Sequence, residues 1–194
     1  EVARAAGLRE VSDEDIRQRI GEPLGPMLAA LFGVSGDPLV ALTRAYSETY
    51  VRLTKTLERP FPDTIEMLHR LRERGWLLAI ATGKSQNGAE NATRRMSIAP
   101  LFDGIHGIIP GTPGKPDPAV LNRAMEDLGV SPEQSIMVGD TTFDLDMAAA
   151  VDVPSVAVSW GVHAIEVLKG RSPSALVYTM TELEAELNQR FTRL

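Results

Sequence analysis

Two aspartates, Asp140 and Asp144, stand four residues apart with two threonine hydroxyls between them. The run 135–138 before them predicts a buried strand, and the run 145–150 after them predicts a helix. A strand that passes through Gly-Asp into a helix places its acids at the carboxyl edge of a sheet, where open α/β sheets bind ligands. Crowded carboxylates repel each other unless a cation or proton lies between them, and Mg²⁺ prefers such oxygens.

The same residues also fit a helix cap. Asp and Thr are ordinary residues at the N-terminal end of a helix, because their side-chain oxygens accept free backbone N–H groups. The stretch 139–144 therefore leaves a metal site and a cap both open when it is taken alone.

A second polar group follows the apolar run 76–81, which predicts a strand buried on both faces of a parallel sheet. Thr82, Gly83 and Lys84 come next and lead into a polar helix that reaches about residue 96. A hydroxyl and backbone N–H groups at a helix start form a cradle for an anion. The alternative is a plain helix cap at Thr82 or Ser85.

Lys115 lies in a loop between Gly114 and Pro116. Proline restricts the backbone there, so the ammonium group can be aimed, although an ordinary solvated lysine remains the alternative. Together, a hydroxyl, an ammonium group and a metal held by acids could converge on one dianion, which is the set that phosphoryl transfer needs. A nucleophile is missing from this set, and a carboxylate is the candidate type.

The composition excludes some classes of function. The chain has 194 residues, of which 43% are hydrophobic and 24% charged, with a net charge of −6 and no cysteine. This is typical of one domain, or of one domain with a smaller companion, and the acidic balance argues against a nucleic-acid partner. The absence of cysteine fits a cytoplasmic protein, and we see neither a membrane-spanning run nor a signal peptide.

The hydrophobic pattern changes at the stretch 59–62. Residues 1–59 predict helices only: Ser12 with Asp15 is a capping signal, and a stripe of leucines and tyrosines from Leu39 to Leu57 predicts a core-facing helix. Residues 60–194 alternate strands and helices, which predicts a Rossmann-like α/β core with a parallel sheet. Strands are predicted at residues 76–81, 105–109, 135–138, 155–159 and 176–178. Helices are predicted at residues 63–74, 86–96, 118–128, 145–150, 164–169 and 181–190.

Three of these motifs, in this order, resemble the haloacid dehalogenase superfamily of hydrolases, in its phosphoglycolate-phosphatase-like branch. Residues 81–84 resemble the second family motif, residues 114–118 the third and residues 139–144 the fourth. The resemblance implies that Thr82 binds the phosphoryl group, with Gly83 and Lys84 beside it, and that Lys115 binds the phosphate and the nucleophile. It implies that Asp140 and Asp144 hold or orient Mg²⁺, and that residues 1–59 are a helical cap that screens substrates.

The first motif of the family, Asp-x-Asp-x-Thr after a central strand, is absent from the sequence. It supplies the nucleophilic aspartate and an acid–base aspartate. We therefore expect an N-terminally truncated cap, a sheet without its central first strand, and roughly 20 further residues upstream, enough for a strand and its turn. We expect the 194-residue chain to be inactive or nearly so. Gly83, where relatives often have Asn, and Val151-Asp152, where they often have Ala-Gly, are smaller departures.

The resulting prediction is a Mg²⁺-dependent phosphatase of a small phosphorylated metabolite that acts through a phospho-aspartyl intermediate. A sugar phosphomutase of the same superfamily and a non-catalytic, degenerate binding protein are the alternatives. A haloacid dehalogenase is disfavoured, because it needs no metal and an unneutralised pair of acids is costly. The oligomeric state and the substrate itself cannot be read from the sequence.

Overall fold

The computed structural model describes residues 1–191, with the side chains of Lys55, Thr56 and Phe191 outside the described part. The chain divides into two compact units, Glu1–Arg59 and Pro60–Leu194. No single helix of the described chain is long and apolar enough to cross a membrane. The pair Leu24–Phe32 and Gly36–Thr54 meets the length and composition requirement only together, across a bend of 116°.

The first unit is helical in its described residues. Its helices are α1 (Val2–Ala5), α2 (Asp13–Arg17), α3 (Leu24–Phe32) and α4 (Gly36–Leu57). Ser12 caps α2 by accepting the N–H of Asp15, as its spacing predicts. The prediction of a core-facing stripe on α4 is correct only in part. Leu39 and Leu42 join the core of this unit, whereas Leu57 is 71% exposed.

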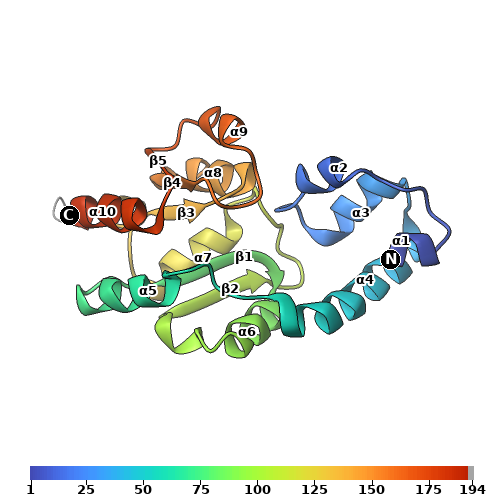
Figure 1. The fold of residues 1–194 in the computed structure, drawn as a ribbon, viewed down its shortest axis with the longest axis horizontal. Helices are drawn as coiled ribbons and strands as arrows, with labels where there is room; N and C mark the ends of the chain where they lie inside the picture. Colours follow the sequence, from blue (N-terminus) through green and yellow to red (C-terminus); the bar gives the residue numbers. More distant parts are fainter. Residues whose placement is uncertain (192–194) are drawn as a thin grey trace. The chain divides into compact units, whose positions relative to one another are not determined.

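The second unit alternates strands and helices (Figure 1). Its strands are β1 (Ala79–Ser85), β2 (Gly104–Ile108), β3 (Met137–Gly139), β4 (Ser155–Val158) and β5 (Ala175–Val177). Its α-helices are α5 (Thr64–Glu73), α6 (Gln86–Arg95), α7 (Ala119–Leu128), α8 (Thr142–Ala149), α9 (Ile165–Lys169) and α10 (Met180–Phe191). Two short 3₁₀ turns, η1 (Ala99–Leu101) and η2 (Pro132–Gln134), precede β2 and β3. All strand pairs are parallel, so the predicted α/β class is confirmed.

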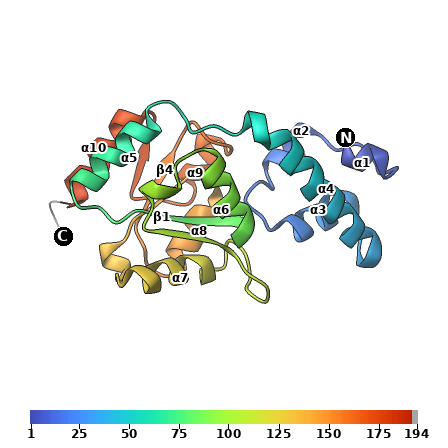
Figure 2. The same cartoon turned by 90° about the horizontal axis from the view of Figure 1, so that it is seen from below.

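Helices pack on both faces of the strands. Val156 and Val158 of β4 point into a core made with α5 and α10, whereas Ala157 between them packs against α8 and α9. This alternation is the period of two that a strand imposes. Figures 1 and 2 both show α5 beside α10, where Arg70 and Glu184 form an ion pair at 2.7 Å.

The sheet is in two pieces, β1-β2 and β3-β4-β5, and β1 and β3 are not paired with each other. Figure 1 draws the arrows of β2 and β3 with the same sense, so the carboxyl ends of both pieces lie on the same side of the unit. Val138, in the middle of β3, is 37% exposed. Among the described residues no strand lies between β1 and β3, as expected for a sheet without its central strand.

The boundaries of β1 differ from the prediction. The strand begins at Ala79 instead of residue 76 and continues through Ser85, past a bulge between Ala81 and Ser85. It begins late because the N–H of Leu78 donates to the carboxylate of Asp103 at 2.8 Å instead of to a strand. It ends late because Ser85 still pairs with Ile108 of β2, a long-range contact that local hydrophobicity does not report.

His106 on β2 gives the fold a testable dependence on pH. Its side chain is buried, Nδ1 lies 3.5 Å from Asp127 Oδ2 on α7, and Nε2 has no hydrogen-bond partner among the described residues. Burial lowers the pKa of His106 from its ordinary value of 6.5, and the nearby Arg123 lowers it further, against the opposing effect of Asp127. Below that ordinary value the unfolded chain binds a proton that the folded chain resists, so stability falls as pH falls.

We therefore expect His106→Gln to weaken this dependence. The free energy of unfolding of the wild type, from urea titrations, should drop more than that of His106→Gln between about pH 7.5 and about pH 5.5, the range in which histidine titrates. Parallel losses in the two proteins would show that His106 does not contribute.

Candidate active site

The turn after β3 forms a reciprocal cap at the start of α8. Thr141 Oγ1 accepts the N–H of Asp144 at 3.3 Å, and Asp144 Oδ2 accepts the N–H and the hydroxyl of Thr141 at 3.1 and 2.7 Å. Gly139 permits this close approach, because a Cβ at that position would overlap the side chain of Asp144. The helix begins at Thr142, three residues earlier than predicted, because this cap draws the turn into the helix.

The second oxygen of Asp144 binds Lys115. The Lys115 ammonium group and Asp144 Oδ1 form an ion pair whose side chains are only 8% and 9% exposed. Lys115 comes from the loop between β2 and α7, so the pair joins the two pieces of the sheet. Within that loop Asp117 accepts the N–H of Ala119 at 2.9 Å, which holds the backbone near the lysine.

Asp140 lies half-buried at the end of β3. Its Oδ2 accepts the N–H of Val162 at 2.8 Å, and its backbone carbonyl accepts the N–H of His163 at 3.2 Å. Its Oδ1 accepts no hydrogen bond from the described residues. No cluster of three His, Asp or Glu side chains suited to a metal is present in the described part of the chain. Asp140 therefore fits Mg²⁺ as a single carboxylate ligand, since this ion keeps several of its waters.

Thr82, Gly83 and Lys84 lie within β1 and not at a helix start, which corrects the predicted cradle. Helix α6 begins only at Gln86 and is capped by Ser85, which accepts the N–H of Gly88 at 3.2 Å. Thr82 Oγ1 accepts the N–H of Lys84 at 3.3 Å. No acceptor among the described residues takes the hydroxyl proton of Thr82, which can therefore donate to an anion.

The structure thus brings some of the predicted residues into contact and leaves others apart. Lys115 and Asp144 form an ion pair, and Asp140 lies on the same turn as Asp144. Thr82 belongs to the other piece of the sheet, and no hydrogen bond among the described residues joins it to Asp140 or Lys115.

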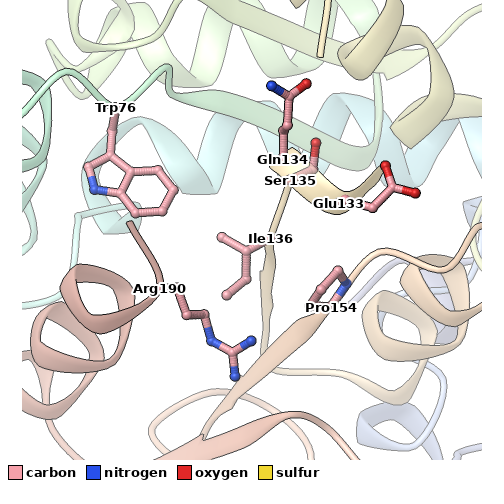
Figure 3. A pocket seen from close by; sticks show the side chains of 7 residues that line it. All are labelled: Trp76, Glu133, Gln134, Ser135, Ile136, Pro154 and Arg190. Carbon is pink, nitrogen blue, oxygen red and sulfur yellow. The ribbon is translucent and has the colours of Figure 1, made fainter. Parts of the chain in front are cut away.

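A cavity of about 150 Å³ lies elsewhere in the unit (Figure 3). Its walls are Trp76, Glu133, Gln134, Ser135, Ile136, Pro154 and Arg190. These residues precede β1, β3 and β4 or belong to α10, so the cavity lies at the amino ends of the strands. Asp140 and Lys115 follow the carboxyl ends, and the cavity is therefore not part of the candidate site.

Sequence reasoning left out the loop between β4 and α9. Val162 and His163 donate to Asp140, the N–H of Thr142 donates to His163 Nδ1, and Gly161 lies close to the side chain of Asp140. His163 is the one ionisable residue in the segment 159–164, and a lone histidine belongs to none of the motifs found in the sequence. A backbone amide such as that of Val162 leaves no signal in a sequence.

The buried ion pair between Lys115 and Asp144 should contribute to the stability of the fold. Lys115→Met leaves Asp144 buried without its cation, and we expect a loss of about 3–5 kcal/mol in the free energy of unfolding. Asp144→Asn should cost a similar amount, and the double variant less than the sum, because neither charge is then left alone. Urea titrations measure all three.

Arg171→Met is the matched control for these variants. It removes an exposed ion pair, in which Arg171 Nε lies 2.7 Å from Asp146 Oδ1. Asp146 lies on α8, the helix that also carries Asp144. A loss of about 1 kcal/mol or less is expected. Equal losses for Lys115→Met and Arg171→Met would contradict the importance given to the buried pair.

Known proteins share both the sequence and the fold. The family model described as "Haloacid dehalogenase-like hydrolase" matches residues 1–158. The chain is 30% identical to a phosphoglycolate phosphatase of Mesorhizobium japonicum, over 78% of this chain and 66% of that protein. It is 31% identical, over 90% of this chain and 78% of the other, to a protein of Caldanaerobacter subterraneus whose name refers to the pyrophosphatase PpaX. A haloacid dehalogenase-like hydrolase from Streptococcus pneumoniae superposes with a TM-score of 0.85 at 26% identity, covering 96% of this chain and 86% of that one. The chain therefore belongs to the haloacid dehalogenase-like hydrolase family.

Proposed function

We propose that the protein is a Mg²⁺-dependent phosphatase of a small phosphorylated metabolite, with residues 1–59 as a cap that screens substrates. The observation that carries the proposal is the buried pair of Lys115 and Asp144 on the turn that also carries Asp140, whose Oδ1 accepts no hydrogen bond from the described residues. A fixed cation and a carboxylate able to bind a metal, at the carboxyl ends of parallel strands, suit a phosphate dianion. The names of the phosphatase relatives support the same class of reaction.

Each residue has a role that follows from its contacts. Asp144 holds the ammonium group of Lys115, whose remaining N–H donors can bind phosphoryl oxygens. Thr82 can donate its hydroxyl proton to another phosphoryl oxygen, with the backbone of Gly83 and Lys84 beside it. Asp140 would hold Mg²⁺ through Oδ1, whereas both oxygens of Asp144 are bound to Lys115 and Thr141, so Asp144 would act by holding the turn and the lysine in place. When bound, Mg²⁺ supplies positive charge that stabilises the transferring group.

The nucleophile completes the proposal. Family resemblance assigns it to an aspartate of the Asp-x-Asp-x-Thr motif on a strand of the sheet, a motif that the 194 residues do not contain. Its carboxylate would accept the phosphoryl group, and the ester oxygen would leave as an alcohol with a proton from the acid–base aspartate of the same motif. Water, giving a proton back to that aspartate, would then release inorganic phosphate and restore the carboxylate. The division of the sheet supports this assignment, as does the lack of a third acid near Asp140 among the described residues. A cytoplasmic location remains a prediction from composition.

The likeness to a phosphomutase does not favour the alternative reaction. A β-phosphoglucomutase from Clostridium difficile superposes with a TM-score of 0.84, but at 17% identity this likeness shows the fold alone. Incubation with a hexose 1-phosphate separates the two reactions, because a phosphatase releases inorganic phosphate whereas a mutase forms the 6-phosphate.

We expect the protein extended at Glu1 by a strand that bears the Asp-x-Asp-x-Thr motif to release phosphate from p-nitrophenyl phosphate with Mg²⁺, and we expect this release to stop when EDTA is added. Asp140→Asn should lower kcat/KM by at least about 100-fold, because the metal loses its charged ligand. Asp146→Asn, on the same helix but in an exposed pair, is the control and should stay near the wild type.

Two results would count against the phosphatase. Hydrolysis that persists in EDTA or in Asp140→Asn would refute the metal role of Asp140. No hydrolysis of any phosphate ester by the extended protein would favour the non-catalytic binding protein.

A further inference from the structure

The loop between β4 and α9 binds the turn that carries Asp140. The N–H of Val162 donates to Asp140 Oδ2 at 2.8 Å, and the N–H of His163 donates to the carbonyl oxygen of Asp140 at 3.2 Å. In the opposite direction, the N–H of Thr142 donates to His163 Nδ1 at 3.1 Å. Three hydrogen bonds therefore join two short segments about 20 residues apart in sequence.

Gly161 permits this contact. A Cβ at position 161 would overlap the side chain of Asp140, with its Cβ, Cγ and Oδ2 as the nearest atoms. Any other residue would push the loop away from the carboxylate, and the amide of Val162 with it. The closeness of the loop to Asp140 thus depends on the absence of a side chain.

His163 holds the other end of the contact. Its side chain is buried, and its ring meets Phe143 edge-on at 6.0 Å between centroids. Because Nδ1 accepts a hydrogen bond, the proton of the neutral ring lies on Nε2. Nε2 is buried without a hydrogen-bond partner among the described residues, which is a cost to folding. The ring therefore contributes through the bond from Thr142 at the start of α8 and through its packing.

We propose that His163 is a positioning residue for Asp140. The bond from Thr142 holds the loop against the turn, the Val162 amide then fixes Oδ2, and Oδ1 is left as the oxygen for the metal. This inference rests on the proposed function for its consequence in catalysis. Its structural part is the coupling from His163 to the carboxylate of Asp140 through Val162, and this part does not depend on the proposed function. A carboxylate held in one orientation binds a cation more tightly than one that rotates.

Amide hydrogen exchange of the 194-residue chain tests the structural part. His163→Leu removes the acceptor for Thr142, and we expect the amide of Val162 to exchange about tenfold faster, as for the loss of one hydrogen bond to a charged group. His163→Asn offers an oxygen near the position of Nδ1 and should restore slow exchange. Gly161→Ala should also speed exchange at Val162, because the added Cβ pushes the loop away from Asp140. It provides a second test of the contact if His163→Leu does not fold. His69→Leu, exposed on α5, is the control.

Metal dependence tests the consequence for the site. In the protein extended at Glu1 by the Asp-x-Asp-x-Thr strand, His163→Leu should raise the Mg²⁺ concentration for half-maximal hydrolysis about tenfold. The KM for p-nitrophenyl phosphate should stay unchanged, and His163→Asn should restore the Mg²⁺ requirement. A purely structural role would lower the fraction of folded enzyme without moving the Mg²⁺ midpoint.

Two outcomes overturn the inference. Unchanged exchange of Val162 in a folded His163→Leu overturns the coupling from His163 to Asp140. Faster exchange with an unchanged Mg²⁺ midpoint overturns the consequence of that coupling for the metal. An extended wild type without hydrolytic activity would defeat the proposed function alone, because the exchange of Val162 still decides whether His163 positions Asp140.

Discussion

The buried ion pair of Lys115 and Asp144 is the constraint on which the candidate site depends. Removing two charges from water costs several kcal/mol per ion, and only good geometry with further hydrogen bonds offsets that cost. Asp144 meets this condition, because it also accepts the N–H and hydroxyl of Thr141. The pair fixes the β2–α7 loop to the start of α8, and so adds a polar link between the two pieces of the sheet to the apolar packing of α7 against α8.

This double use of Asp144 explains why the sequence alone could not separate a cap from a functional site. A helix cap and a ligand-binding turn need the same residue types, a short side chain with an oxygen acceptor ahead of a helix. In the structure one oxygen of Asp144 caps α8 and the other binds Lys115, so the helix cap is confirmed, whereas the metal site stays a prediction. What distinguishes them is the partner from residue 115, which is distant in sequence.

The alternation of strands and helices was predictable for a physical reason. Strands covered on both faces, such as β4, are short apolar runs, and these are visible without knowledge of their neighbours. The end of β1 was not predictable, since its pairing from Ser85 to Ile108 is set by β2. The exposure of Leu57 was equally hidden, because a helical stripe shows which side is apolar and not how far along the helix a partner extends.

The candidate site likewise has some residues that can be recognised in the sequence and other groups that cannot. Residues that would bear charge, such as Lys115 and Asp140, are visible by type and spacing. The groups that orient them are backbone amides and missing side chains, so Gly161 and the N–H of Val162 carry no chemical signature of their own. Orientation decides which carboxylate oxygen is left for a ligand. A reactive residue can therefore be named from sequence, whereas its geometry depends on a loop that folds back from the next strand.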